Sequence, residues 1–298
     1  MSTATAEQTE TRPTRPPGAS TRRWVIAVVI TAASIWSVTG IDITLDRLLS
    51  APGDAWAIFK QMFPPAFANV YERGAVGKVL ESVYIAWIGT IIGAALSLPL
   101  AFMAANNVAP RWVREPIRQL FNAIRAVPEL ILAGILIPVT GLGAWAGTLA
   151  IGLHSVGTLG KWATESIESV DTGPIEAVEA CGGQWVSGMR WAVAPQVMPT
   201  ITSYWLFRFE INVRASAVLG MIGAGGVGSE LVSHLVFRNF PEAFAVLLMT
   251  IVMVITIDTV SGAVRRRIIR GNSSPTGRES RSAEAVMDVT GLRGNAKP

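Results

Sequence analysis

Apolar residues along the chain are gathered into long runs that are separated by polar segments. The runs cover residues 24–41, 83–105, 130–139, 142–162, 201–222 and 243–257. A helix needs about 20 mostly apolar residues to cross about 30 Å of hydrocarbon, and several of these runs meet that length outright. The run at 130–139 is short and reaches it only together with residues 121–125 and 141–142. The pattern predicts an all-α membrane protein with about six transmembrane helices.

Basic residues gather at alternate ends of these runs. They precede the first run, separate the second from the third, bracket the polar segment between the fourth and fifth, and follow the last: Arg12, Arg15, Arg22, Arg23; Arg111, Arg114, Arg118, Arg125; Lys161, Arg190; Arg265, Arg266, Arg267, Arg270. Cytoplasmic loops carry an excess of Lys and Arg. Six spans with both termini cytoplasmic place every cluster inside, so we expect a multi-pass protein of the plasma (inner) membrane.

Composition supports this interpretation. Half of the residues are hydrophobic, only 15% are charged, and the mean hydropathy is +0.42, which argues against a soluble globular protein. The net charge of +4 fits contact with anionic membrane lipid. Nucleic acid is a poor partner because the arginines flank spans and form no single stripe. The single cysteine, Cys181, excludes an internal disulfide and a cysteine zinc site, and no metal ligand set is evident.

The polar segments divide the chain. Residues 1–20, rich in Thr, Pro and Arg, and residues 271–298 predict a disordered cytoplasmic N-terminus and tail. The first span and an extracytoplasmic loop occupy 21–78, where apolar residues predict a helix over 55–63. That helix either packs on the bundle or lies at the outer interface. The core spans 79–270 and contains a polar loop at 163–198.

The fifth run contains the four side chains that are most costly to place in a membrane: Arg208, Glu210, Asn212 and Arg214. A charge at the centre of the bilayer costs about 2.5–3.5 kcal/mol even on the lenient insertion scale. Glu210 and Arg214 are four residues apart and could neutralise each other. Arg208 and Asn212 lie on nearly the opposite side of the helix, so Arg208 needs another partner, such as an anion, Glu129 or a second subunit.

Two interpretations of these residues remain open. One is a structural salt-bridge network. The other is a route for an oxyanion, because the planar guanidinium of Arg208 matches phosphate-type oxygens. His154 and Ser155, in the fourth run, could join Arg208 in such a path, although a lone intramembrane histidine also suits a helix–helix hydrogen bond.

A glycine-rich segment follows the fifth run, with Gly223, Gly225, Gly226 and Gly228. The spacing matches a dinucleotide-binding fingerprint, but the run before it is a full span with buried arginines, and no second strand ending in an acidic residue follows. We expect a bend at the outer end of the span that could move as a gate.

The sequence contains no phosphate-binding loop of the kind that holds ATP. Such a loop needs a glycine five residues before Gly-Lys-Ser/Thr. Gly77-Lys78 is followed by Val79 and Gly160-Lys161 by Trp162, so neither fits. Any ATP must be handled by a partner.

The polar loop has a distinctive spacing: Glu176, Ala177, Glu179, Gly182 and Pro195. It predicts a short helix, a turn at Gly182-Gly183 and a second amphipathic helix halted before Pro195. This loop resembles the cytoplasmic coupling loop of ABC-importer permeases, on which a separate ATPase subunit pushes. Val178, Ala192 and Ala194 depart from the usual residues, while the spacing is intact.

Further segments resemble the phosphonate-transporter permease family (PhnE-like). They are Ala126-Val127-Pro128-Glu129-Leu130, Leu153-His154-Ser155-Val156-Gly157, Glu210-Ile211-Asn212-Val213-Arg214 and the run from Val218 to Gly228. The resemblance covers about residues 75–270. It implies a bundle like that of type I ABC importers, working by alternating access as a homodimer with a cytoplasmic ATPase dimer and an extracytoplasmic binding protein.

The same resemblance implies import of phosphonate, phosphite or phosphate, with no catalysis and no cofactor in this chain. The substrate route would then involve His154, Ser155, Arg208, Asn212 and Arg214, and the outer gate the glycines at 223, 225, 226 and 228. Two alternatives are a permease for another solute, such as methionine or a quaternary amine, and a stand-alone channel.

Overall fold

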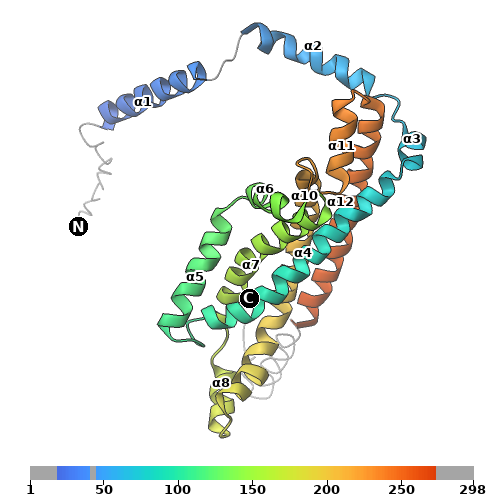
Figure 1. The fold of residues 1–298 in the computed structure, drawn as a ribbon. Helices are drawn as coiled ribbons and strands as arrows, with labels where there is room; N and C mark the ends of the chain where they lie inside the picture. Colours follow the sequence, from blue (N-terminus) through green and yellow to red (C-terminus); the bar gives the residue numbers. More distant parts are fainter. Residues whose placement is uncertain (1–18, 41–44, 273–298) are drawn as a thin grey trace, which may run out of the picture. The chain divides into compact units, whose positions relative to one another are not determined.

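The computed structural model describes residues 19–40 and 45–272, and within them every element is a helix (Figure 1). The chain forms two units, residues 1–60 and 61–298. The first unit holds α1 (Ala19–Thr39) and α2 (Leu45–Gln61). The helix predicted over 55–63 is therefore confirmed, and it begins ten residues earlier, at Leu45. Apart from residues 19–20 and 271–272, the predicted disordered ends lie outside the described residues.

The second unit is a helical bundle with short helices at each end. Its long helices are α4 (Ala75–Ala104), α5 (Arg111–Ala126), α6 (Glu129–Thr140), α7 (Ala144–Glu168), α10 (Ala194–Gly220) and α12 (Phe240–Asn272). The short helices α8 (Gly173–Ala180) and α9 (Trp185–Gly188) lie at one end, here named the coupling end, and α3 (Phe67–Glu72) and α11 (Val227–Val236) lie toward the other (Figure 1).

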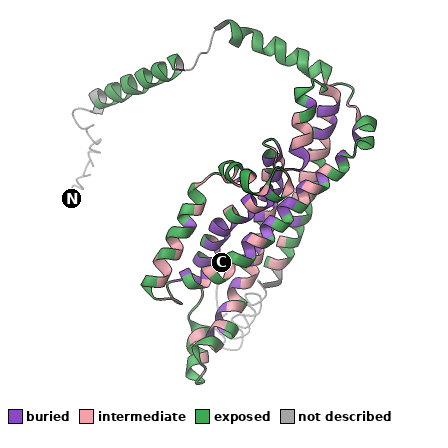
Figure 2. Cartoon of the chain, viewed as in Figure 1, coloured by how far each residue is buried: buried purple, intermediate pink, exposed green. Residues whose placement is uncertain are grey.

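Small residues bring α4 and α7 into close contact. A Cβ atom added to Gly89 would lie 2.8 Å from the Ile151 side chain, and one added to Gly93 would lie 2.5 Å from Ser155 Cβ. Buried residues are concentrated on α4, α7 and α10 (Figure 2). This close approach of glycine-bearing helices allows α10 to pack against both.

Gly93→Ala should destabilise the bundle by about 1–3 kcal/mol, because the added methyl group must push α4 and α7 apart. The matched control is Gly77→Ala in the same helix, where nothing lies within 4 Å of the added Cβ. Thermal unfolding of the two purified variants in detergent measures the difference. Equal melting temperatures would contradict the packing account.

Only some of the helices have the length and apolarity of an isolated membrane span. In the described part of the chain, α4 and α12 do, and the α5–α6 pair does if the two are counted together. The six-span expectation is therefore not confirmed by this criterion. The helices α7 and α10 have 25 and 27 residues, but both carry charged side chains. Of these charged side chains, Arg208 and Glu210 on α10 are buried against neighbouring helices.

The predicted third span is not one continuous helix. The helices α5 and α6 meet at 90° across Val127-Pro128. A residue before proline is driven into the extended region, and Val127 adopts φ −91° and ψ 120°. Pro128 itself is extended with ψ 143° and caps α6. The proline thus converts one expected span into two helices and places Glu129 at the bend.

Candidate functional site

A charged cluster lies inside the bundle where α6, α7 and α10 meet. Nε of Arg208 donates to Ser155 Oγ at 3.0 Å, and its Nη2 donates to Glu129 Oε1 at 2.5 Å. The same Nη2 lies 2.7 Å from Nδ1 of His154, which is 2.8 Å from Glu129 Oε1. The structure brings His154 and Ser155 into contact with Arg208, and of the three suggested partners of Arg208 it places Glu129 beside it.

The imidazole of His154 can serve only one neighbour through Nδ1. Unprotonated, this nitrogen accepts from Arg208; protonated, it donates to Glu129. Glu129, His154 and Arg208 therefore allow two alternative hydrogen-bonding patterns, which differ in whether Nδ1 of His154 accepts or donates.

Asn212 joins the cluster to α4. Its Nδ2 donates to Thr90 Oγ1 at 2.8 Å and to Ser155 Oγ at 3.1 Å. Asn212 is fully buried, and its Oδ1 has no hydrogen-bond partner among the described residues. Arg208 and Asn212 are four residues apart and share one face of α10, as expected. Thr90 was not predicted, because a lone threonine in an apolar run gives no signal.

The cluster borders a cavity of about 400 Å³. Glu129 and His154 stand in its wall among apolar residues such as Leu130, Val218 and Leu219. The side chains of Glu129 and His154 are 19% and 16% exposed, whereas that of Arg208 is 5% exposed. The carboxylate and imidazole thus separate the guanidinium from the cavity, and Glu129 neutralises the charge of Arg208.

The predicted pairing of Glu210 with Arg214 is wrong. Arg214 Nη1 lies 3.6 Å from Asp258 Oδ2 on α12, and its side chain is 51% exposed. Glu210 is buried, and its Oε1 lies 3.9 Å from Nη2 of Arg265 on α12. Packing of α12 against α10 supplies partners that compete with the local spacing. Arg214 is therefore not part of the cluster around Arg208.

The coupling loop forms a short helix and a turn, as predicted. Glu176, Ala177 and Glu179 are exposed on α8, which has no buried residue. Gly182 adopts φ +77°, a conformation that glycine reaches without strain. Gly183 N donates to Val178 O at 2.9 Å and closes the turn.

The second helix of the loop does not stop before Pro195. A π-helix over Met189–Val193 continues α9 directly into α10, and Pro195 lies in the first turn of α10. Proline has no backbone N–H for an intrahelical bond, and the π-helical turn directly before it is where this continuous helix departs from regular α geometry. Along this segment Ala192 is buried and Met189 is half-buried, but Trp185 is 59% exposed.

Exposed apolar side chains mark the outer surface of the loop. Val186 and Trp191 are 64% and 70% exposed, beside Trp185. The inner side of the loop packs on the bundle through Ile175 and Met189. A surface of this kind usually marks an interaction site.

The glycine-rich turn is anchored to neighbouring helices. Gly223, Gly225 and Gly226 have φ between +78° and +89°, and residues 224–228 are buried. Gly143 N donates to Gly223 O at 2.9 Å, and Val227 N donates to Ser82 Oγ at 2.8 Å. Gly228 lies directly against Ala217 of α10. The predicted bend is confirmed; its role as a gate is not tested by this geometry.

A second polar cluster, not anticipated from the sequence, lies among α3, α11 and α12. Arg73 Nη1 pairs with Glu242 Oε2 at 2.8 Å, and His234 Nδ1 lies 3.1 Å from the same oxygen. Glu230 is 3.2 Å from His234 Nε2. Glu230 and His234 are four residues apart on α11, whereas Arg73 is distant in sequence from the other three.

Comparison with known proteins identifies the family. Residues 97–273 match the family described as binding-protein-dependent transport system inner membrane component. The phosphite transport system permease protein PtxC of Stutzerimonas stutzeri is 39% identical over 243 residues, which are 81% of this chain and 86% of that protein. The phosphate-import permease protein PhnE of Mycolicibacterium smegmatis is 39% identical over 216 residues, 71% of this chain and 40% of that protein.

A solved structure has the same fold. Inward-facing MetNI, a methionine ABC transporter, matches with a TM-score of 0.58 and 20% identity, over 67% of this chain and 96% of the matched chain. The fold, the coupling loop and the family match agree. The chain belongs to the family of binding-protein-dependent transport system inner membrane components and is the permease subunit of an ABC importer.

Proposed function

We propose that this permease imports a small phosphorus oxyanion: phosphite, a phosphonate or phosphate. The observation that carries the proposal is the ion pair of Arg208 with Glu129, whose carboxylate lines a cavity of about 400 Å³. An anion that enters the cavity would replace this carboxylate. The printed functions of the relatives, phosphite transport and phosphate import, support the same class. Arg208 offers the planar fork that binds such oxygens in pairs.

The route would pass the cavity, with His154, Ser155 and Asn212 positioning Arg208. Glu129 acts as the internal counter-ion that holds the guanidinium when no substrate is present. A phosphorus oxyanion with two free oxygens competes with Glu129 for Nη2, and displaced Glu129 can still turn to His154. We leave Arg214 out of this route because it pairs with Asp258 instead.

The free face of α5 supports a water-filled route in the half of the bundle near the coupling end. This helix packs on α7 through Phe121 and exposes Gln119, Asn122 and Arg125. Such side chains are too costly to face hydrocarbon. A route between two copies of the permease places this face in water, which favours the homodimer expected from the family resemblance.

Transport would proceed by alternating access. A cytoplasmic ATPase dimer closes on ATP, the paired coupling loops move with it, and the two bundles open outward to receive substrate from the binding protein. The turn at 223–228 would separate from α4 and α7 at the outer gate, breaking the two hydrogen bonds that hold it.

Uptake competition tests the substrate class. In cells that depend on the assembled importer, excess phosphite, methylphosphonate or phosphate should reduce uptake of a labelled phosphorus oxyanion. Excess methionine and excess quaternary amine test the alternative substrates. If either of these reduces uptake and the phosphorus compounds do not, the protein is a permease for that other solute. Uptake without ATP would indicate a channel.

We propose six spans with both termini cytoplasmic, and Cys181 allows a direct test. This cysteine is exposed in the coupling loop and is the only one in the chain. A membrane-impermeant maleimide should label it in inverted vesicles and not in intact cells. The control is Phe237→Cys in a Cys181→Ser background, because Phe237 is 73% exposed between α11 and α12 and should be labelled from outside. The reverse pattern would invert the topology.

A further inference from the structure

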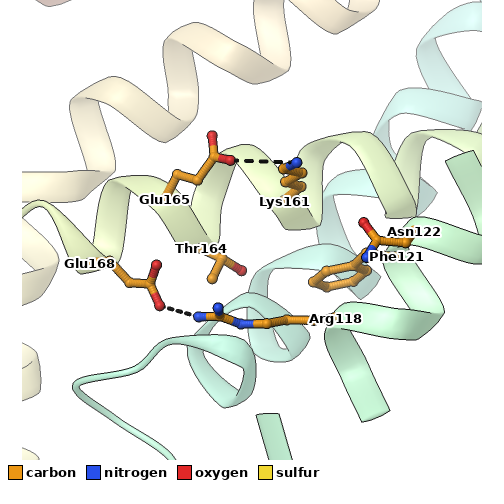
Figure 3. A pocket seen from close by; sticks show the side chains of 7 residues that line it. All are labelled: Arg118, Phe121, Asn122, Lys161, Thr164, Glu165 and Glu168. Atoms are coloured by element: carbon orange, nitrogen blue, oxygen red, sulfur yellow. Dashed lines mark hydrogen bonds and ion pairs between the residues drawn. The ribbon is translucent and has the colours of Figure 1, made fainter. Parts of the chain in front are cut away.

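The end of α7 makes a set of contacts that involve none of the residues assigned above to the substrate route. Glu168, its last residue, forms an ion pair with Nη2 of Arg118 on α5, and its Oε1 accepts from the backbone amide of Asn106 at 2.7 Å. Arg118 Nε in turn donates to the carbonyl of Ala104, at the end of α4, at 2.9 Å. Figure 3 shows Arg118 and Glu168 reaching toward each other across the space between the two helices.

These contacts form one side of a cavity of about 230 Å³ between α5 and α7 (Figure 3). The Phe121 ring closes it, packed so tightly against Gly160 that no side chain fits there. The side chains of Arg118 and Glu168 are 30% and 25% exposed, so their pair is partly shielded from water. A second pair in the wall, Lys161 with Glu165, is longer at 3.9 Å and more exposed.

The position of Glu168 in the chain gives the pair its significance. The residues that follow it, from Ser169 onward, lead directly into α8 of the coupling loop. Any displacement of that loop acts on Glu168 before it acts on the rest of α7. Through Arg118, the same displacement acts on α5.

At its other end, α5 leads into the charged cluster. Glu129 follows α5 after the bend at Val127-Pro128 and contacts both His154 on α7 and Arg208 on α10. The segment from Arg118 to Glu129 is thus attached to α7 by a charged contact at each end, with Phe121 packed between them. Within this segment α5 runs unbroken from Arg118 to Ala126, so a displacement of Arg118 is carried along the helix to the bend before Glu129.

We propose that Arg118 and Glu168 are positioning residues that transmit movement of the coupling loop along α5 to Glu129, and so control when Glu129 releases Arg208. The inference rests on the proposed function, because it assigns Glu129 and Arg208 to the substrate route. The bend at Val127-Pro128 converts displacement along α5 into rotation of α6, which begins at Glu129.

The test follows movement of α6 without reference to any substrate. Leu130→Cys in a Cys181→Ser background places a thiol in the cavity wall, next to Glu129. In the full importer with its ATPase and binding protein, ATP should change the labelling rate of this thiol by about fivefold or more, the lower range of measured coupling between sites. Glu168→Gln and Arg118→Gln should each abolish that change, and the double variant should be no worse than either.

Two controls separate transmission from a general structural role. Arg114→Gln removes a cation from the same helix as Arg118. The partner of Arg114 is its neighbour in sequence, Glu115, at 3.4 Å, so this variant should leave the ATP-dependent change in labelling intact. Arg118→Lys, which keeps the charge, should restore part of it. ATP hydrolysis should persist in the glutamine variants while uptake per ATP falls.

An ATP-dependent change that survives in both glutamine variants, or is absent from the parent, would overturn the inference. If the glutamine variants lose the ATP-dependent change in labelling, ATP hydrolysis and thermal stability to the same extent, the pair of Arg118 with Glu168 has only a structural role. These outcomes are independent of the proposed substrate. An importer that carries another solute can still show ATP-dependent labelling. Likewise, if phosphorus oxyanions fail to compete for uptake, the labelling result is unaffected.

Discussion

Arg208→Ala should lower uptake through the assembled importer by about 100-fold or more. Two charge-assisted hydrogen bonds to a bound oxyanion are worth about 1.5–3 kcal/mol each, and each 1.4 kcal/mol is about tenfold. Initial rates of uptake at saturating binding protein, corrected for the amount of permease in the membrane, provide the measurement.

The single variant also removes the partner of Glu129, which has a separate effect. An unpaired, partly buried carboxylate destabilises a protein by about 3–5 kcal/mol, so loss of uptake alone could reflect loss of folded protein. The double variant Arg208→Ala with Glu129→Ala removes both charges. It should recover thermal stability and membrane insertion but not transport. Recovery of transport in the double variant would show that the pair is structural only.

Arg214→Ala is the matched control on the same helix. Its partner, Asp258, is 37% exposed and its own side chain is half exposed, so the loss of this 3.6 Å pair should change stability by about 0–1 kcal/mol. Uptake should stay close to that of the parent. A large loss of uptake in Arg214→Ala would return this residue to the substrate route, as the sequence first suggested.

The double variant Trp185→Ala with Val186→Ala should weaken binding of the ATPase subunit by about 30-fold or more. Truncation of a central aromatic residue at an interface removes about 2 kcal/mol or more, which corresponds to a factor of about 30. Both side chains are more than half exposed in the isolated chain and lie on the outer side of the coupling loop. Co-purification of the ATPase at graded detergent and salt concentrations, followed by titration of binding, measures the effect.

Trp112→Ala is the control for that experiment. Trp112 is 79% exposed on α5 and lies outside the coupling loop. Its removal takes away an exposed aromatic residue of the same kind without touching the loop, so ATPase binding should be unchanged. Equal weakening in both variants would show that the coupling-loop surface has no special part in ATPase binding.

The positions of the helices were predictable because the signal is local. The apolar runs at 83–105, 201–222 and 243–257 correspond to α4, α10 and α12. Helical spacing alone placed Arg208 and Asn212 on one face, and glycine preference marked the turns at 182 and 223–226. The bend at Val127-Pro128 was missed because the span was predicted from the number of apolar residues alone. That criterion ignores the preference of a residue before proline for extended backbone.

The partners of charged residues could not be predicted in the same way. Spacing within α10 suggested Glu210 with Arg214, but each finds a partner on α12 instead. A pair within one exposed helix turn is worth only about 0.2–0.5 kcal/mol, which tertiary packing easily overrides. For Arg208 the sequence left three partners open, and only the bend before α6 brings Glu129 to it.

The sequence by itself determined that this chain is a helical membrane protein with a coupling loop and no ATP site, and the family followed from its motifs. Those properties depend on hydrophobicity and on spacing over a few residues. The tertiary structure decided which charges neutralise one another, where the cavity lies and how Glu168 is connected to Arg118. Many of these contacts join residues far apart in the chain, such as Glu168 with Arg118, 50 residues apart, and Glu129 with Arg208, 79 residues apart. Such contacts are set by helix packing, and no local pattern of residues encodes them.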